Sequence, residues 1–192
     1  VETSSVLAET VPMLPHVASL VGDPQVRHRG TLGGTVAHGD GASDLPAALL
    51  ALDATMVVQG PRGTRNVKAS EFFKGFMETA IGEDEILTEI QVPKGFMSWS
   101  YQKFNRRAQD WAIVGVAAAK NGSTRVALVN MGATPLRSNG AESALASGAS
   151  GAEAAQHAAD GITPPADLNA STEYRKHLAT VLVRRALEEM NI

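Results

Sequence analysis

The chain has 192 residues, enough for one large domain or two small ones, and its 44% hydrophobic and 19% charged residues are ordinary for a globular protein. The formal net charge of −3 disfavours nucleic acid as a partner, because surfaces that bind it are usually strongly basic. Cysteine is absent, so the chain can house no disulfide or iron–sulfur cluster, and a cytoplasmic location is expected. No apolar run approaches the roughly 20 residues of a membrane helix, and the start, VETSSVLAET, does not resemble a signal peptide.

The first part of the chain is expected to contain two helices around a glycine-rich stretch. Apolar residues three or four apart predict a helix over residues 3–21, broken at Pro12 and Pro15 and ending near Gly22. After the glycines, DLPAALLALDA (44–54) predicts a buried helix with proline in its first turn.

A small sheet is expected next. TMVVQG (55–60) predicts a strand, which a hairpin turn joins to a returning strand at 66–68. SEFFKGF predicts a helical turn, with Ser70 as its cap. In DEILTEIQVP, residues 86, 88, 90 and 92 alternate with their neighbours, which predicts a strand with one buried face, ended by Pro93.

The second part is expected to be a sheet followed by helices, so that the fold class is α+β. Three antiparallel strands are predicted at 99–104, 112–119 and 125–131, with Asn121-Gly122 as a hairpin turn. Residues 140–161 contain nine alanines, which favours two short helices capped at Gly148 and Gly161 over a flexible linker. The final segment predicts a helix whose apolar face holds Tyr174, Leu178, Val181, Leu182, Ala186 and Met190.

The stretch RHRGTLGGTVAHGDGASDLP (27–46) is the first candidate site. Gly33 and Gly34 permit a positive φ, and a loop of that kind can aim successive amides at an anion. Threonines at 31 and 35 add hydroxyl donors, and Asp44 suits the hydroxyls of a ribose or sugar chain. The pattern is neither the Rossmann fingerprint nor a Walker loop. A structural turn stays open as an alternative, as does a metal site at His38, Asp40 and Asp44.

YQKFNRRAQDWA (101–112) is the second candidate. It is either a charged loop between strands or a place where Lys103 or an arginine faces a phosphate or an electron-rich ring. The loop at 106–110 can then gate access to that ring, and Trp111 is expected in the core.

At these residues the sequence resembles a known family. QVRHRGTLGGTVAHGDGASDLPAALLALDA is similar to the second flavin motif of the FAD-carrying medium subunit of molybdenum hydroxylases, the xanthine and aerobic carbon monoxide dehydrogenase groups. GEDEILTEIQVP, YQKFNRRAQDWAIVGVAAA and PPADLNASTEYRKHLATVLVRRAL resemble later segments of the same subunit, so the resemblance spans nearly the whole chain.

The resemblance implies the second half of a vanillyl-alcohol-oxidase-type (PCMH-type) FAD-binding domain at residues 1–94, and a flavoprotein C-terminal domain, a three-stranded antiparallel sheet with helices, at 95–192. The family's first flavin motif has no counterpart, so we expect that it precedes this sequence or has been lost. The residues that the resemblance assigns to FAD are Thr31, Leu32, Gly33 and Gly34 at the diphosphate and ribityl chain; Thr35 (often Asn in relatives), Ser43 and Asp44 at hydroxyls; Ile86 and Leu87 at the ring or adenine; and Lys103 at the isoalloxazine.

The implied role is electron transfer within a hetero-oligomer. A molybdopterin-binding large subunit would oxidise substrate, [2Fe-2S] clusters on a small subunit would relay electrons, and FAD on this chain would pass them to an acceptor. Two alternatives remain: an interaction subunit with weak or lost flavin binding, and a non-redox binder of phosphates or nucleotides.

Overall fold

The computed structural model describes residues 1–192, and five short helices precede its first strand. The expected helix at 3–21 is broken at Pro12, as predicted, while Pro15 is tolerated in the first turn of the second piece. A helix that was not expected follows, with the Asp23 side chain accepting a bond from the Val26 amide. The helices are α1 (Ser5–Thr10), α2 (Met13–Ser19), α3 (Pro24–Arg29), α4 (Leu32–His38) and α5 (Asp44–Ala51).

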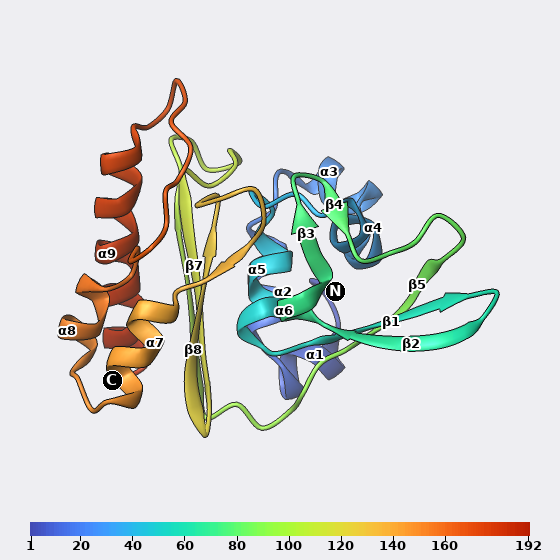
Figure 1. Ribbon diagram of the computed structural model, residues 1–192, viewed down its shortest axis with the longest axis horizontal. Coiled ribbons are helices and arrows are strands. Elements are labelled where there is room, and N and C mark those ends of the chain that lie inside the picture. Colours follow the sequence, from blue (N-terminus) through green and yellow to red (C-terminus); the bar gives the residue numbers. More distant parts are fainter.

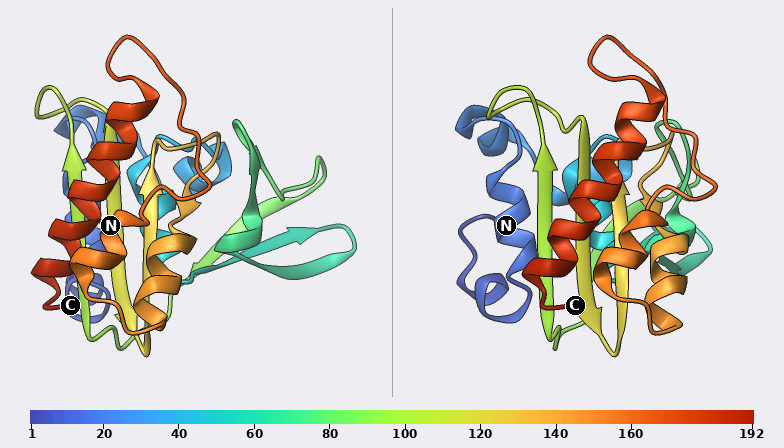
Figure 2. Two further views of the ribbon diagram at one scale, coloured as in Figure 1. Left: turned by 60° about the vertical axis from the view of Figure 1, so that its left-hand side comes forward. Right: turned by 90° about the vertical axis from the view of Figure 1, so that its left-hand side faces the viewer.

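The small sheet extends away from the body of the molecule, on the right in Figure 1 and in the left view of Figure 2. Its order is β2-β1-β5, all antiparallel, with β1 at Thr55–Gly60, β2 at Gly63–Lys68 and β5 at Ile86–Gln91. In the sequence between β2 and β5 lie α6 (Ala69–Phe72) and a short hairpin of β3 (Phe73–Gly75) and β4 (Glu78–Thr79). Ser70 does not cap α6, because the helix already begins at Ala69.

The predicted alternation of buried residues in β5 is partly wrong, because the strand contains a bulge. Ile90 lies opposite the buried Met56, but Leu87, not Thr88, lies opposite the buried Val58. The extra residue changes the phase of the alternation, so Leu87 and Ile90 face the core while Ile86 is 65% exposed.

The second part contains four antiparallel strands in the order β6-β7-β8-β9, one more than expected. The additional strand is short, β9 (Leu136–Arg137), beside β8 (Ser123–Val129). The others are β6 (Ser98–Phe104) and β7 (Val114–Asn121). The helices expected at 140–161 are confirmed as α7 (Asn139–Ala146) and α8 (Gly151–Gln156), and the linker alternative is wrong; Gly148 and Gly161 follow them with positive φ of 89° and 71°.

Helices cover both faces of this sheet, as Figure 1 shows. Residues of one parity, including Val116 and Leu128, pack with α7, α8 and the last helix, α9 (Thr172–Glu189). Residues of the other parity, including Ala117 and Val129, join the core formed by α2 and α5. The strands are therefore buried on both faces, which explains their nearly continuous apolar sequence.

The buried face of α9 is rotated from the predicted one. Leu178, Leu182 and Ala186 are buried as expected, but Tyr174 is 43% exposed. Arg175 takes its place in the core: its guanidinium donates to the carbonyls of Ile113 and Asn130 and to Asp167 Oδ2.

Candidate functional site

The glycine-rich stretch folds as a helix. Thr31 is the N-cap of α4, where its Oγ1 accepts from the Gly34 amide at 2.9 Å and its carbonyl accepts from the Thr35 amide at 3.1 Å. The helix ends at Gly39, which has the left-handed φ of 71°. The expectation of a loop with positive φ at Gly33 and Gly34 is therefore wrong, because both residues have helical backbone angles.

The start of α4 nevertheless leaves polar backbone available. Leu32 and Gly33 occupy the first two helical positions, whose N–H groups have no acceptor inside a helix. A methyl group added at Gly33 would meet no atom within 4 Å, whereas one at Gly34 would lie 2.7 Å from Thr31 Oγ1. The side-chain direction of Gly33 is thus open and its amide has no acceptor within the helix, an arrangement that suits an anionic group.

Ser43 and Asp44 form the start of α5 and are both 6% exposed. Ser43 takes the N-cap position without a side-chain cap bond. Asp44, expected to face sugar hydroxyls, is held by two protein donors: Tyr101 Oη at 2.5 Å from Oδ1 and Lys103 Nζ at 2.8 Å from Oδ2.

Lys103 is the second predicted residue in this buried cluster. Its side chain is 7% exposed, and Nζ also donates to the Leu20 carbonyl at 2.9 Å, just after α2. β6 therefore connects to both α2 and α5 through one ammonium group. Burial, together with the neighbouring Asp44 carboxylate, raises the pKa of Tyr101 well above its ordinary value, so its hydroxyl remains a donor.

Ile86 and Leu87 lie on β5, which contacts α4. Leu87 is half-buried against the first core and Ile86 points outward. The fold thus brings the predicted strand beside α4, which holds the glycine pair, and α4 in turn contacts α5. Thr35 lies in α4 with its side chain half-buried.

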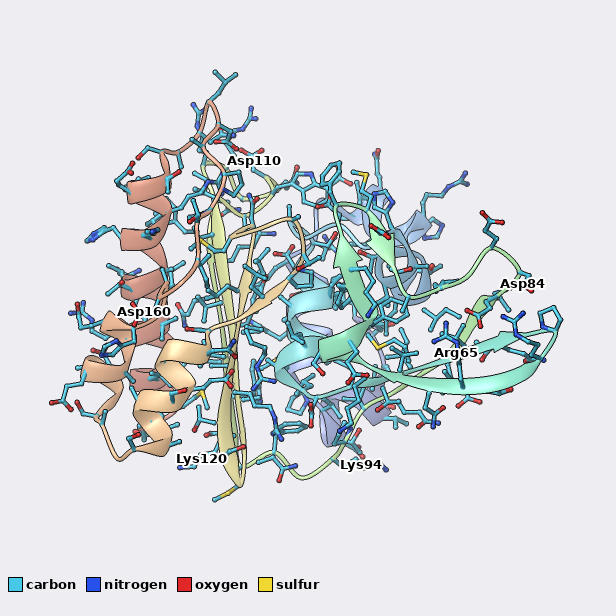
Figure 3. All side chains as sticks on the ribbon, in the orientation of Figure 1. Arg65, Asp84, Lys94, Asp110, Lys120 and Asp160 are labelled. Carbon is cyan, nitrogen blue, oxygen red and sulfur yellow. The ribbon has the colours of Figure 1, made fainter.

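The loop after β6 is exposed and closed on itself. The Ile113 amide donates to the Phe104 carbonyl at 2.7 Å, and Arg107 pairs with Asp110 at 3.0 Å. Trp111 is 60% exposed, so its expected place in the core is wrong. Asp110 marks this end of the molecule in Figure 3. The exposure of Trp111 was not predictable, because an apolar residue next to a strand has the same sequence pattern as a core residue.

The residues of the alternative metal site, His38, Asp40 and Asp44, are not arranged to hold an ion. Asp40 accepts from the Ala42 amide at 2.8 Å, and Asp44 is occupied by Lys103 and Tyr101. No group of three or more His, Asp or Glu side chains converges as a metal site would require.

Comparison with known proteins agrees with this architecture. Residues 1–95 match the family described as FAD binding domain in molybdopterin dehydrogenase, and residues 99–190 match the CO dehydrogenase flavoprotein C-terminal domain. The fold is thus that of a flavoprotein subunit.

Individual relatives give the same result. The carbon monoxide dehydrogenase medium chain of Hydrogenophaga pseudoflava is 40% identical over 96% of this chain and 69% of its own length. The nicotine 6-hydroxylase medium subunit of Paenarthrobacter nicotinovorans is 33% identical over 97% of this chain and 69% of its own.

Solved structures are equally similar. A carbon monoxide dehydrogenase structure from Hydrogenophaga pseudoflava superposes with a TM-score of 0.91 at 39% identity, covering 98% of this chain and 70% of that one. Quinoline 2-oxidoreductase from Pseudomonas putida 86 gives 0.89 at 31% identity, with coverages of 98% and 70%. The chain therefore belongs to the FAD-binding medium-chain family of molybdopterin dehydrogenases, and it is an oxidoreductase subunit. None of its helices has the length and apolar character needed to cross a membrane.

Proposed function

We propose that the start of α4 holds the diphosphate of FAD, with Thr31 to Thr35 as its contact segment. The observation that carries this proposal is the pair of amides at Leu32 and Gly33, free of intrahelical partners beside open space. Phosphate oxygens would accept from these amides at the positive end of the helix. The Thr31 side chain is already engaged as the cap, so its part is to fix the helix start.

Asp44 and Lys103 would lie at the ribityl chain and ring. A carboxylate has about four lone-pair positions and an ammonium has three N–H groups. Protein partners use two positions of Asp44 and two N–H groups of Lys103. Each group therefore retains capacity toward a ligand, Asp44 and Ser43 toward hydroxyls and Lys103 toward the ring.

Ile86 and Leu87 would supply apolar contact to the ring or adenine. Ile86 is 65% exposed at the end of a strand that contacts α4. A flat apolar group that covers this exposed side chain removes apolar surface from water, which favours binding.

FAD supplies the redox chemistry of this family, and the chain's residues bind and orient it. We propose that electrons arrive from [2Fe-2S] clusters on a small subunit, after substrate oxidation on a molybdopterin-binding large subunit, and leave to an external acceptor. The hetero-oligomeric relatives support this arrangement. The proposed division of the chain, 1–94 and 95–192, places α4 and α5 in one unit and Lys103 in the other.

The test is a titration of the full chain with FAD, followed by flavin fluorescence and by thermal melting. Gly33→Val should abolish saturable binding, because its side chain fills the space beside the free amide. Ala37→Val, an exposed position later in the same helix, is the matched control and should bind as wild type. Failure of wild-type chain to bind FAD would contradict the proposal; stabilisation by plain nucleotides but not FAD would favour a non-redox binder.

The alternative, an interaction subunit with weak or lost flavin binding, has one observation in its favour. Asp44 and Lys103 satisfy each other in a buried pair, so neither needs a ligand for its charge. It predicts co-purification with a molybdopterin-containing subunit that is unaffected when flavin is removed. Dissociation of the complex on flavin removal would contradict it.

A further inference from the structure

Tyr101 is a buried polar residue that the family resemblance leaves without a role. It is 6% exposed, and its hydroxyl donates to Asp44 Oδ1 at 2.5 Å across the junction between β6 and α5. Gly115, paired with Lys103 on the next strand, leaves room for this hydroxyl: a methyl group added there would lie 3.3 Å from Tyr101 Oη and 3.0 Å from Val129. The lack of a side chain at Gly115 on the neighbouring strand β7 thus leaves room for the hydroxyl.

Tyr101 and Lys103 act on the same carboxylate from the same side of β6. They are two residues apart, so both point toward α5, and they bind different oxygens of Asp44. Lys103 also binds the Leu20 carbonyl, and one of its three N–H groups remains without a protein acceptor. The direction of that N–H depends on the positions of the Leu20 carbonyl and of Asp44, and Tyr101 is the other donor that holds Asp44.

We infer that Tyr101 is a positioning residue for the flavin site, acting through Asp44 on Lys103. This inference rests on the proposed function, in which Lys103 faces the ring. The Tyr101 bond draws negative charge toward Oδ1 and so leaves more of the Lys103 positive charge effective at a bound flavin. That charge stabilises the reduced cofactor, which carries more negative charge than the oxidised one.

A purely structural role predicts something different. The hydroxyl would then stabilise the junction of β6 with α5, and its loss would lower the melting temperature of the chain equally with and without FAD. A positioning role predicts, in addition, a change in the cofactor's own properties. The midpoint potential of bound flavin separates the two, because it does not depend on the free energy of unfolding.

The experiment compares Tyr101→Phe with Tyr174→Phe in the full chain loaded with FAD. Tyr174 is the matched control: it is the other tyrosine of the chain, 43% exposed, and its hydroxyl makes no hydrogen bond with another residue of the chain. Tyr101→Phe should shift the flavin midpoint potential to a more negative value, by about 30 mV for a tenfold loss of preference for the reduced state. The visible absorption bands of the flavin should shift as well, and Tyr174→Phe should change neither.

A second comparison separates an effect that acts through Asp44 from a general effect on folding. In an Asp44→Asn background, Tyr101→Phe should shift the potential much less, because the carboxylate through which it acts is gone. An unchanged potential in Tyr101→Phe, with only a lower melting temperature, would overturn the inference while leaving the proposed function intact. Failure of the wild-type chain to take up FAD would instead overturn the proposed function.

Discussion

Gly33 is the residue at which stability and cofactor binding should respond in opposite directions. Its backbone is helical and a methyl group there meets nothing within 4 Å, so Gly33→Ala should stabilise the chain without FAD by about 0.5–1 kcal/mol. The same methyl lies where the diphosphate would approach, so affinity for FAD should fall. Chemical denaturation and FAD titration measure the two effects.

Gly34→Ala is the control for this prediction, since its methyl would clash with the Thr31 oxygen at 2.7 Å and should destabilise the chain. An unchanged FAD affinity in Gly33→Ala would show that the ligand does not approach this position.

Individual residues show where sequence reasoning ends. Asp44 and Lys103 were identified as candidate site residues, but their pairing with each other joins residues 59 apart, which no local pattern reveals. Arg175 was not expected in the core, because an arginine in a helix is usually exposed. It is 1% exposed, and three oxygens from separate loop segments accept hydrogen bonds from its guanidinium.

At the scale of elements, the hairpin of the small sheet carries a pH-dependent contact, at the end that Arg65 and Asp84 mark in Figure 3. Arg65 donates to Glu85 at 2.9 and 2.6 Å, and the Gly82 amide adds a bond at 2.8 Å. The Arg65 bonds, and then the Gly82 bond, lower the pKa of Glu85 to about 2.

Because the folded-state pKa is lowered, the contribution of Glu85 to stability is fully present above the ordinary glutamate pKa of about 4.3. It is lost as the pH falls from there through about 2. The difference in melting temperature between wild type and Glu85→Gln should therefore be constant down to about pH 5 and shrink below it. Glu83→Gln, an exposed neighbour without a partner, should show no such change; an equal pH dependence in both variants would contradict the assignment.

The elements also show which sequence signals are reliable. Long apolar segments predicted β7, β8 and α5 correctly, because burial dominates their sequence, and the helical spacing of apolar residues predicted α9. The α4 helix was missed since two adjacent glycines argue against a helix, although Thr31 and Gly39 are good caps. The bulge in β5 was invisible because residues 86, 88, 90 and 92 alternate without a break in the sequence, whereas the strand pairing shifts by one residue.

For the whole molecule, the sheet of the second part shares its core with the first part. Tyr101, Ala117, Ala127 and Val129 pack with α2 and α5 rather than with α9. A fragment of residues 99–192 would expose this apolar face to water, so we expect it to lack a cooperative thermal transition and to bind a hydrophobic dye. A sharp transition in the fragment equal to that of the full chain would contradict the shared core.

The resemblance recovered the whole-molecule architecture and the family, since four separate motifs agreed with one known arrangement. Packing between the two parts was not predictable in the same way. The apolar sequences of the strands predict that both faces are buried. They do not predict which of the two helical layers covers which face.

The central claim is that the free amides at the start of α4 hold the flavin nucleotide. It is tested most directly by recording the backbone amide resonances of the labelled full chain during titration with FAD. Leu32 and Gly33 should show the largest shifts, saturating together, while the amide of Gly148 at the far layer of helices stays unchanged. Saturable binding of FAD that leaves Leu32 and Gly33 unshifted would contradict the account.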